Sequence, residues 1–362
     1  MNVYLDSTIY YLQKFGGISV YWNELSNYLS SHRNIKLRFI ESNYNPKLFN
    51  DSLHIKRHQV HYDRKLPIQL LRYLPIRLKE VDKNSILHSS YFRFSRNKRV
   101  KNICTVYDFT YEFHFKGLSS KIHHYQKKIA LKKASGIICI SDNTKNDLLS
   151  LYPNLIDKPI KVIYLAASDS FRPLSEINIA KTRFSELKNK KIISFVGKRV
   201  PYKNFSLAVD IINNLPQDYH LVIIGGGELN NNELEILSKS NGRFTHYNIV
   251  NQEELNKLYN ISFCFLYPSL YEGFGIPILE SMQAGCPVIC QSISSIPEVY
   301  GDVENLVTNI NSLDEFCNNI LKLEDKEYRQ RIITQGFKNA SSFNWNKTAE
   351  RTYDFYQEII AL

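Results

Sequence analysis

Residues 261–290, ISFCFLYPSLYEGFGIPILESMQAGCPVIC, contain two apolar runs separated by a glycine loop and a helical stretch. The run Ile261–Leu266 predicts a buried strand, and Gly275–Ala284 predicts a helix that starts after the loop. Pro287–Cys290 predicts the next strand. A strand, a helix and a second strand in this order indicate a parallel sheet with helices packed on it. This stretch therefore favours an α/β fold.

The same alternation extends outward from this stretch to both ends of the chain. It predicts two doubly wound, Rossmann-like domains, residues 1–168 and 190–344, with a cleft at the carboxyl ends of their sheets. Residues 166–190 contain Pro173 and many polar side chains and are expected to connect the domains, while a last helix over 345–362 can pack back onto the first. Further strands are predicted at Asn2–Leu5, Ile35–Ile40, Ser85–His88, Asn102–Tyr107, Gly136–Ile140, Ile160–Tyr164, Lys191–Val196, His220–Ile224 and Arg243–Tyr247, with helices such as Leu118–Ala134 and Phe205–Asn214 between them.

The composition excludes several other classes of protein. Hydrophobic residues make up 43% of the chain, which is enough for a packed core. No apolar run approaches the roughly 18 residues of a membrane span. The N-terminus lacks the basic and apolar segments of a signal peptide, so we expect a cytoplasmic protein. The six cysteines form no C-x-x-C pair and are expected to be buried reduced thiols rather than zinc ligands or disulfides.

The charge is unevenly distributed along the chain. The net charge is +11, from 46 basic and 35 acidic residues. Residues 1–170 hold 27 basic and 13 acidic residues, a balance of +14, and the remainder holds 19 and 22, a balance of −3. This asymmetry predicts an anionic partner for the first half: nucleic acid, an acidic membrane surface or a phosphorylated acceptor. A solvated basic face without a partner remains the alternative.

The strongest chemical signal is the loop and helix start at Tyr271–Glu280. Gly273 and Gly275 flank Phe274 and let the backbone approach a ligand closely. The free N–H groups at the start of the following helix attract a phosphate. Glu272 in the loop and Glu280 on the helix can bind hydroxyls of two different sugar rings. The alternative is a plain loop–helix junction with two surface glutamates.

A second cluster suits a diphosphate. Gly197 follows a predicted strand and opens the segment GKRVPYKN, which supplies Arg199 and Lys203. A lysine acts as a point charge on a phosphate, and an arginine binds it with two parallel hydrogen bonds. Read alone, the cluster would be a solvated turn. Two weaker glycine signals follow or precede other elements: Gly225 and Gly226 after a strand, and Gly16 and Gly17 after Phe15 and before a helix.

These motifs together resemble glycosyltransferase family 4, whose members have the GT-B fold. Glu272 and Glu280 match its E-x7-E motif, which implies that the first contacts the donor hexose and the second the nucleotide ribose. The segment at Gly197 resembles the family pattern G-R-x-x-x-x-K-N, which implies that Lys203 and an arginine hold the donor diphosphate. Lys198 and Arg199 both lie near the arginine position, and Arg199 is favoured. Gly16, Gly17, Gly225 and Gly226 resemble family loops near donor and acceptor.

One position departs from the family pattern. Many relatives carry a histidine that contacts the donor sugar after the strand that ends at Val106, and this chain has Tyr107 there. A phenol can donate a hydrogen bond but is neutral near pH 7. Asp108 and His114 lie close in sequence and can supply part of the lost role. The resemblance implies retention of anomeric configuration by front-face attack, with Glu272, Arg199, Lys203, Tyr107 and Asp108 at the catalytic centre.

The co-substrates follow from the resemblance and the charge. No D-x-D triplet occurs in the chain, so we expect no metal or other cofactor. The resemblance implies a nucleotide diphosphate sugar, such as GDP-mannose or a UDP-hexose, as donor. Residues 56–102 mix basic and bulky apolar side chains, which suits an anionic membrane and a saccharide acceptor linked to polyprenyl diphosphate. The resemblance implies bacterial surface-polysaccharide synthesis, such as that of O-antigen or capsule. The alternative there is a core helix with basic flanks.

Three other functions remain open. Another GT-B-type enzyme, such as a nucleotide-sugar epimerase, would not explain the E-x7-E match. A basic nucleic-acid-binding protein is suggested by charge alone, since no binding motif is present, and no nucleic-acid partner is expected. An inactive partner subunit of the same fold is suggested by Tyr107.

Overall fold

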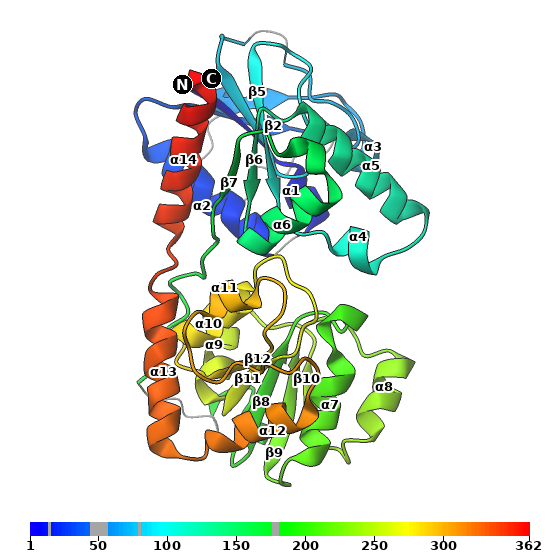
Figure 1. Cartoon of the computed structure of the whole chain (residues 1–362), viewed down its shortest axis with the longest axis vertical. Coiled ribbons are helices and arrows are strands. Elements are labelled where there is room, and N and C mark those ends of the chain that lie inside the picture. The colour runs from blue at the N-terminus through cyan, green and yellow to red at the C-terminus, as the bar shows by residue number, and fades with distance from the viewer. Residues whose placement is uncertain (14–15, 44–56, 79–80, 176–180) are drawn as a thin grey trace. The chain divides into compact units, whose positions relative to one another are not determined.

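The computed structural model describes residues 1–13, 16–43, 57–78, 81–175 and 181–362. Phe15, Lys56 and Lys79 lie outside the described residues, as do residues 176–180 of the predicted connection. The chain forms two compact units (Figure 1), one of Met1–Leu165 with Asn344–Leu362 and one of Ala166–Phe343. Each unit contains one parallel sheet with helices on it. The predicted class, α/β with two doubly wound domains, is confirmed.

The sheet of the first unit has seven parallel strands in the order β3-β2-β1-β4-β5-β6-β7. Strand β1 is an interior strand, where Val3 pairs with Leu37 of β2 on one side and Ile86 of β4 on the other. The strands are β1 (Asn2–Asp6), β2 (Lys36–Glu41), β3 (Val60–Tyr62), β4 (Ser85–Ser89), β5 (Val100–Val106), β6 (Gly136–Cys139) and β7 (Ile160–Val162). The helices are α1 (Thr8–Leu12), α2 (Gly17–Ser31), α3 (Ile68–Leu71), α4 (Thr110–His114), α5 (Leu118–Lys133), α6 (Asp142–Leu151) and α14 (Trp345–Ala361), with short 3-10 turns at Arg57–Gln59 and Pro153–Leu155.

Helix α14 belongs to the first unit although it ends the chain. It lies beside α2 in Figure 1, where Tyr21 stacks on Trp345 with ring centroids 6.2 Å apart. Tyr356 of α14 shares a 2.6 Å hydrogen bond with Nδ1 of His88 on β4. Burial lowers the pKa of His88 to about 3, so this histidine is a neutral hydrogen-bonding bridge. These contacts explain why an amphipathic tail closes onto the N-terminal sheet.

The sheet of the second unit has five parallel strands in the order β10-β9-β8-β11-β12. These are β8 (Lys191–Val196), β9 (Tyr219–Ile224), β10 (Phe244–Tyr247), β11 (Cys264–Tyr267) and β12 (Val288–Cys290). The helices are α7 (Phe205–Asn214), α8 (Asn231–Ser238), α9 (Gln252–Ile261), α10 (Ile276–Gln283), α11 (Ile296–Tyr300), α12 (Leu313–Lys322) and α13 (Lys326–Ala340), with 3-10 turns at Ser185–Leu187 and Pro201–Lys203. All residues of β9, β11 and β12 are buried, as expected for strands covered on both faces.

Two expectations from the sequence are corrected. The strand predicted from Ile261 begins at Cys264, because α9 runs through Ile261 and the Ser262 hydroxyl hydrogen-bonds the Leu258 carbonyl at 2.6 Å. The stretch 56–102 is not a continuous basic and apolar surface. Leu71, Ile76, Leu78 and Phe92 are buried, and Arg93 pairs with buried Asp63 at 2.5 Å, whereas Leu70 and Tyr73 are exposed as expected. All six cysteines are buried and free, as predicted.

Candidate active site

Two loops of the second unit bring Lys203 and Glu272 together. Lys203 ends the 3-10 turn after β8, and Glu272 lies in the loop between β11 and α10. The Leu270 amide donates to the Tyr202 carbonyl at 2.7 Å and joins the two loops. Lys203 Nζ lies 2.5 Å from Glu272 Oε1, and the two side chains are only 15% and 11% exposed. The sequence placed both residues in the donor site but did not anticipate their direct ion pair.

Tyr267 lies beside this ion pair and contacts Lys203. It is the last residue of β11, and Lys203 Nζ lies 3.3 Å from its hydroxyl and 5.0 Å from its ring centroid. Burial and the negative charge of Glu272 hold the pKa of Tyr267 well above its ordinary value, so the hydroxyl keeps its proton. The sequence analysis missed Tyr267. Its position at the carboxyl end of a buried strand was the available signal.

The backbone of the Glu272 loop is fixed by two serines that the sequence analysis also missed. The Glu272 carbonyl accepts hydrogen bonds from the hydroxyls of Ser294 and Ser295 at 2.8 and 2.9 Å. Ser295 also donates to the Phe274 carbonyl at 3.0 Å. Ser294 adopts a φ of 56°, a conformation that non-glycine residues rarely take. The loop is therefore held in shape before any ligand binds.

Helix α10 begins directly after this loop, as predicted. Gly275 caps it with a φ of 110°, which an L side chain rarely adopts. Gly273 precedes Phe274, which is buried and packs edge-on against Phe343 with centroids 5.9 Å apart. Gly275 has no side chain that could cap α10. Pro277 has no N–H group and the Ile278 amide donates to the Gly275 carbonyl at 3.0 Å, so the Ile276 amide remains as a donor for an anion.

Glu280 projects from α10. The Tyr259 hydroxyl of α9 lies 3.4 Å from its Oε2. Burial of the carboxyl raises the pKa of Glu280 to about 7, an effect that the Tyr259 hydroxyl partly opposes. A carboxyl buried this way, without a cation in the described contacts, is suited to accept hydrogen bonds from neutral hydroxyls.

Arg199 donates hydrogen bonds to the glycine loop after β9. Its Nη1 donates to the Gly225 carbonyl at 2.6 Å, and its Nη2 donates to the carbonyls of Gly227 and Glu228 at 2.9 and 3.0 Å. Its Nε lies 2.9 Å from Oε1 of Glu233, and the arginine side chain is 1% exposed. The neighbouring Lys198 is exposed.

The glycines of this loop have the conformations that glycine permits. Gly225, Gly226 and Gly227 have φ values of 78°, 82° and 83° in succession, and Gly197 has 119°. A Cβ on Gly226 would lie 2.5 Å from Nη1 of Arg199 and 2.8 Å from the Gly197 carbonyl oxygen. The Arg199 guanidinium and the glycine loop therefore fit each other closely.

The remaining predicted residues lie in the first unit. Tyr107 follows β5 and is buried, with its ring edge-on to Tyr21 at 6.4 Å. Its hydroxyl has no hydrogen-bond partner among the described residues, and burial holds its pKa well above the ordinary value. Asp108 Oδ1 accepts the Thr110 amide at 3.0 Å at the start of α4. His114 ends α4 and is exposed.

Gly16 and Gly17 mark the start of α2. Gly16 precedes the helix in extended backbone, and its carbonyl accepts the Ser19 hydroxyl at 2.9 Å. Gly17 is the first helical residue. A Cβ on Gly16 would meet the end of the flexible Gln13 side chain, so space alone does not require glycine there.

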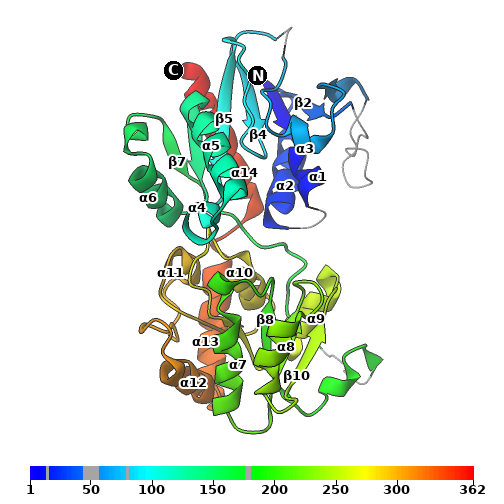
Figure 2. The same cartoon turned by 90° about the vertical axis from the view of Figure 1, so that its right-hand side faces the viewer.

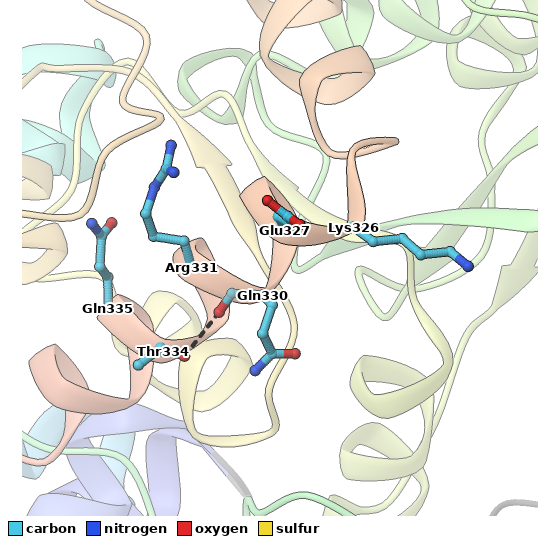
Figure 3. Close-up of a pocket in the computed structure, with 6 residues that line it drawn as sticks. All are labelled: Lys326, Glu327, Gln330, Arg331, Thr334 and Gln335. Carbon is cyan, nitrogen blue, oxygen red and sulfur yellow. Dashed lines mark hydrogen bonds between the residues drawn. The ribbon is translucent and has the colours of Figure 1, made fainter.

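A hollow of about 520 Å³ on the second unit lies apart from these residues. Figure 3 shows that its six lining side chains all project from α13, from Lys326 to Gln335, without converging on one point. Arg331 pairs with Glu304 at 3.3 Å, and the Thr334 hydroxyl donates to the Gln330 carbonyl at 2.8 Å. We assign no function to it.

Comparison with known proteins agrees with the fold and the motifs. Residues 15–169 match the model "Glycosyltransferase Family 4", and residues 178–339 match "Glycosyl transferases group 1". The structure also resembles HepE of Anabaena in complex with UDP and glucose, with a TM-score of 0.74 and 15% identity over 99% of this chain and 100% of that one. These matches define a GT-B glycosyltransferase architecture. The chain belongs to glycosyltransferase family 4.

Two curated relatives act on bacterial saccharides by name. The O-antigen chain mannosyltransferase B of Escherichia coli is 29% identical over 257 residues, which cover 68% of this chain and 66% of the relative. The UDP-Gal:alpha-D-GlcNAc-diphosphoundecaprenol alpha-1,3-galactosyltransferase of the same species is 24% identical over 71% of this chain and 68% of its own length. The chain thus spans about two thirds of each relative's length.

Proposed function

We propose that this protein transfers a hexose from a nucleotide diphosphate sugar to a saccharide acceptor with retention of configuration. The observation that carries the proposal is the Lys203–Glu272 ion pair, held in a rigid loop immediately before the start of α10. A cation, a carboxylate and the Ile276 amide at the start of α10 lie at one place and suit a sugar diphosphate. The names of the two relatives support GDP-mannose or a UDP-hexose as donor.

In this proposal, donor binding replaces the ion pair between Lys203 and Glu272 with contacts from each of these residues to the donor. Its diphosphate takes the Lys203 ammonium, which releases the Glu272 carboxylate to accept a hydrogen bond from a hydroxyl of the hexose. Lys203 then neutralises the charge that develops on the leaving diphosphate. Tyr267 remains as a neutral donor beside both groups. Glu280 accepts hydrogen bonds from the ribose hydroxyls.

The second diphosphate cation is assigned to Lys198 rather than Arg199. The guanidinium of Arg199 already donates to carbonyls of the glycine loop and faces Glu233, whereas Lys198 is exposed and directly follows Gly197. Lys198 also stands at the arginine position of the family spacing. Arg199 then acts as a positioning residue that shapes the glycine loop.

The chemistry at the first unit is proposed to be front-face attack. Tyr107 is held neutral by burial, so it cannot act as a base near pH 7. Asp108 is engaged at the start of α4. A leaving diphosphate that accepts the acceptor's proton needs no protein base, which fits both observations.

The acceptor is proposed to be a lipid-linked saccharide of a bacterial surface polysaccharide such as O-antigen, at an anionic membrane face in the cytoplasm. The names of the two relatives, one for an O-antigen chain and one for a diphosphoundecaprenol-linked sugar, support this choice. None of the described helices is both long and apolar enough to cross a bilayer, so the proposed association is peripheral.

A donor screen tests the proposal. Binding to the native state raises the melting temperature, so one GDP-, UDP- or ADP-sugar should raise it above the others. The selected donor should then be hydrolysed slowly by wild-type protein and about tenfold to a hundredfold more slowly by Glu272→Gln. Stabilisation by a donor without hydrolysis or transfer to any acceptor would favour an inactive partner subunit. No stabilisation by any donor, with salt-sensitive binding to oligonucleotides, would favour the nucleic-acid alternative.

A further inference from the structure

Helices α4 and α5 expose an unusual number of large apolar side chains. Figure 2 shows α5 in front of the sheet of the first unit and α4 below it, at the lower end of the strands. The exposed fractions run from 39% for Tyr111 to 74% for Leu118 and 66% for Tyr125. We call the set the α4–α5 surface: Tyr111, Phe113, Phe115, Leu118, Ile122 and Tyr125. Scattered apolar residues are normal on a protein surface, but six within one helix pair mark an interaction site.

The charged residues around this surface are of one sign. Between residues 110 and 134, all of which are described, the exposed charged residues are lysines: Lys116, Lys121, Lys128, Lys132 and Lys133. The acidic residue of this stretch, Glu112, is 3% exposed and lies 2.8 Å from Nζ of Lys127, which is 1% exposed. The charges of Glu112 and Lys127 neutralise each other, so the exposed charges of residues 110–134 are those of the lysines.

The exposed side chains stand on a fixed support. Lys127 donates to the Asp108 carbonyl at 2.9 Å and lies 4.4 Å from the Phe109 ring centroid, which anchors α4 to α5. The Tyr111 ring stacks on His123 of α5 at 4.2 Å. The aromatic face is therefore presented by packed elements and does not result from a frayed turn.

We propose that the α4–α5 surface docks on an anionic lipid bilayer. Aromatic rings are stable at the boundary between headgroups and acyl chains, and lysines can extend from the same face to anionic headgroups. A second copy of this chain is a poorer occupant, because a two-fold contact would place five lysines against five others. A protein partner fits this face less well, because lysine is depleted at protein–protein interfaces although aromatic residues are common there.

This inference rests on the proposed function, because it assumes that the acceptor is linked to a lipid. Docking at the α4–α5 surface would then serve the proposed reaction. Helix α4 begins directly after Tyr107 and Asp108, at the carboxyl end of β5. A bilayer against α4 and α5 would lie next to the sheet edge that carries these candidate residues. The saccharide could then reach this edge while its lipid stays in the membrane.

Vesicle binding tests the inference directly. The full chain is sedimented with vesicles of phosphatidylglycerol and phosphatidylcholine in equal parts, and with phosphatidylcholine alone. We expect binding to the first and little to the second, with binding falling as salt rises. Each lysine near such a surface contributes about 1 kcal/mol, or roughly fivefold, so Lys121→Gln with Lys128→Gln should weaken binding roughly 25-fold. Leu118→Ser with Tyr125→Ser should weaken it about tenfold or more.

Matched controls come from the second unit. Ile249 is 76% exposed, close to Leu118, and Lys239 is exposed like Lys121, so Ile249→Ser with Lys239→Gln should leave vesicle binding unchanged. Donor hydrolysis in solution should be equal in all variants. Equal binding to both vesicle types, equal losses in the controls, or binding only to an acidic protein would overturn the inference. Normal donor hydrolysis alongside such a result would leave the proposed transferase function standing.

Discussion

Lys203 is the residue whose role the ion pair defines most clearly. It is part-buried, and within the described part of the chain its ammonium forms an ion pair with the Glu272 carboxylate. A part-buried cation with one exchangeable partner is poised for an incoming diphosphate, because the anion replaces a contact rather than creating a new buried charge. The sequence predicted that Lys203 binds the diphosphate. The proposed exchange of Glu272 for the diphosphate follows only from the 2.5 Å contact between Lys203 and Glu272.

We predict that Lys203→Ala weakens binding of a nucleoside diphosphate about tenfold to a hundredfold, because one charge-assisted hydrogen bond is lost. Calorimetric titration measures the dissociation constant. Lys257→Ala is the matched control, since Lys257 pairs with Glu253 at 2.6 Å on the exposed face of α9 in the same unit. Equal affinity in wild type and Lys203→Ala would remove Lys203 from the diphosphate site.

Glu280 gives a prediction about pH. The folded protein keeps a proton on this carboxyl up to about pH 7, whereas the unfolded chain loses it near the ordinary value of 4.5. The folded state therefore binds more protons between these values, and stability falls as pH rises from about 4.5 to 7. Glu280→Gln cannot titrate, so its unfolding free energy should lack this decline, which is on the order of a few kcal/mol.

Chemical denaturation of wild type and Glu280→Gln at pH 5 and pH 8 measures this difference. The variant should match wild type at the lower pH and exceed it at the higher one. Glu253→Gln, at a carboxyl that is 77% exposed, serves as the control and should follow wild type. A Glu280→Gln curve that declines in parallel with wild type would show that Glu280 is not the titrating group.

At the scale of elements, the glycine loop after β9 illustrates a local fit between a side chain and a backbone. Arg199 reaches several of the loop's carbonyls, and Glu233, which also accepts the Asn230 amide at 2.9 Å in the cap of α8, holds the arginine from the other side. The loop, β8 and α8 are thus joined through one guanidinium. We expect its shape to depend on Arg199 even without a ligand.

Gly226→Ala should destabilise the protein more than Gly227→Ala. Both glycines have nearly the same positive φ, so both alanines carry the same backbone strain of roughly 1–2 kcal/mol. Only at Gly226 does the new Cβ also meet Arg199 and the Gly197 carbonyl, whereas nothing lies within 4 Å at Gly227. Denaturation curves and diphosphate affinity of both variants check this. Equal effects would mean that Arg199 does not shape the loop.

Sequence reasoning reached most elements of the second unit because its strands are continuous apolar runs. It found α7 at Phe205–Asn214 and the loop before α10, where glycines and a proline mark the helix start. It did not find the contribution of Ser294 and Ser295, since helix α10 and strand β12 separate them from Glu272 in sequence and their contact leaves no periodic signal. Pairing between distant loops requires the three-dimensional register.

In the first unit, the sequence did not reveal which apolar residues are buried and which are exposed. Basic and apolar residues between 56 and 102 suggested a surface, but Leu71, Ile76 and Leu78 are core residues. Leu70 and Tyr73 are exposed in that stretch, but a larger group of exposed apolar side chains lies on α4 and α5. There Leu118, Ile122 and Tyr125 follow a spacing that equally suits a buried face. Spacing alone cannot tell which face of an amphipathic helix lacks a cover.

At the scale of the whole molecule, the division of charge follows the division into units. The sequence asymmetry, +14 over residues 1–170 and −3 over the rest, separates nearly at Leu165, where the first unit ends before its C-terminal helix. A basic unit for an anionic acceptor and a near-neutral unit for the donor would divide the two substrates between the two folds. The α4–α5 surface gives part of the basic excess a specific use.

Metal independence is a prediction for the whole reaction. Within the ranges that the structure describes, no three His, Cys, Asp or Glu residues group as metal ligands, and cations such as Lys203 and Lys198 are available for the diphosphate. Transfer should therefore persist in excess EDTA at nearly its full rate. Loss of activity in EDTA, restored by Mg²⁺ or Mn²⁺, would contradict the prediction and place an ion on the donor.

The central claim is that Glu272 recognises the transferred hexose and Glu280 the nucleotide. The most direct measurement compares Glu272→Gln and Glu280→Gln for nucleoside diphosphate affinity and for kcat/KM with the intact donor. Glu272→Gln should bind the diphosphate as well as wild type or more tightly, because Lys203 is released from its ion pair, yet lose about tenfold to a hundredfold in kcat/KM. Glu280→Gln should lose affinity for diphosphate and donor alike. Parallel losses in both variants, accompanied by equal drops in melting temperature, would contradict the account.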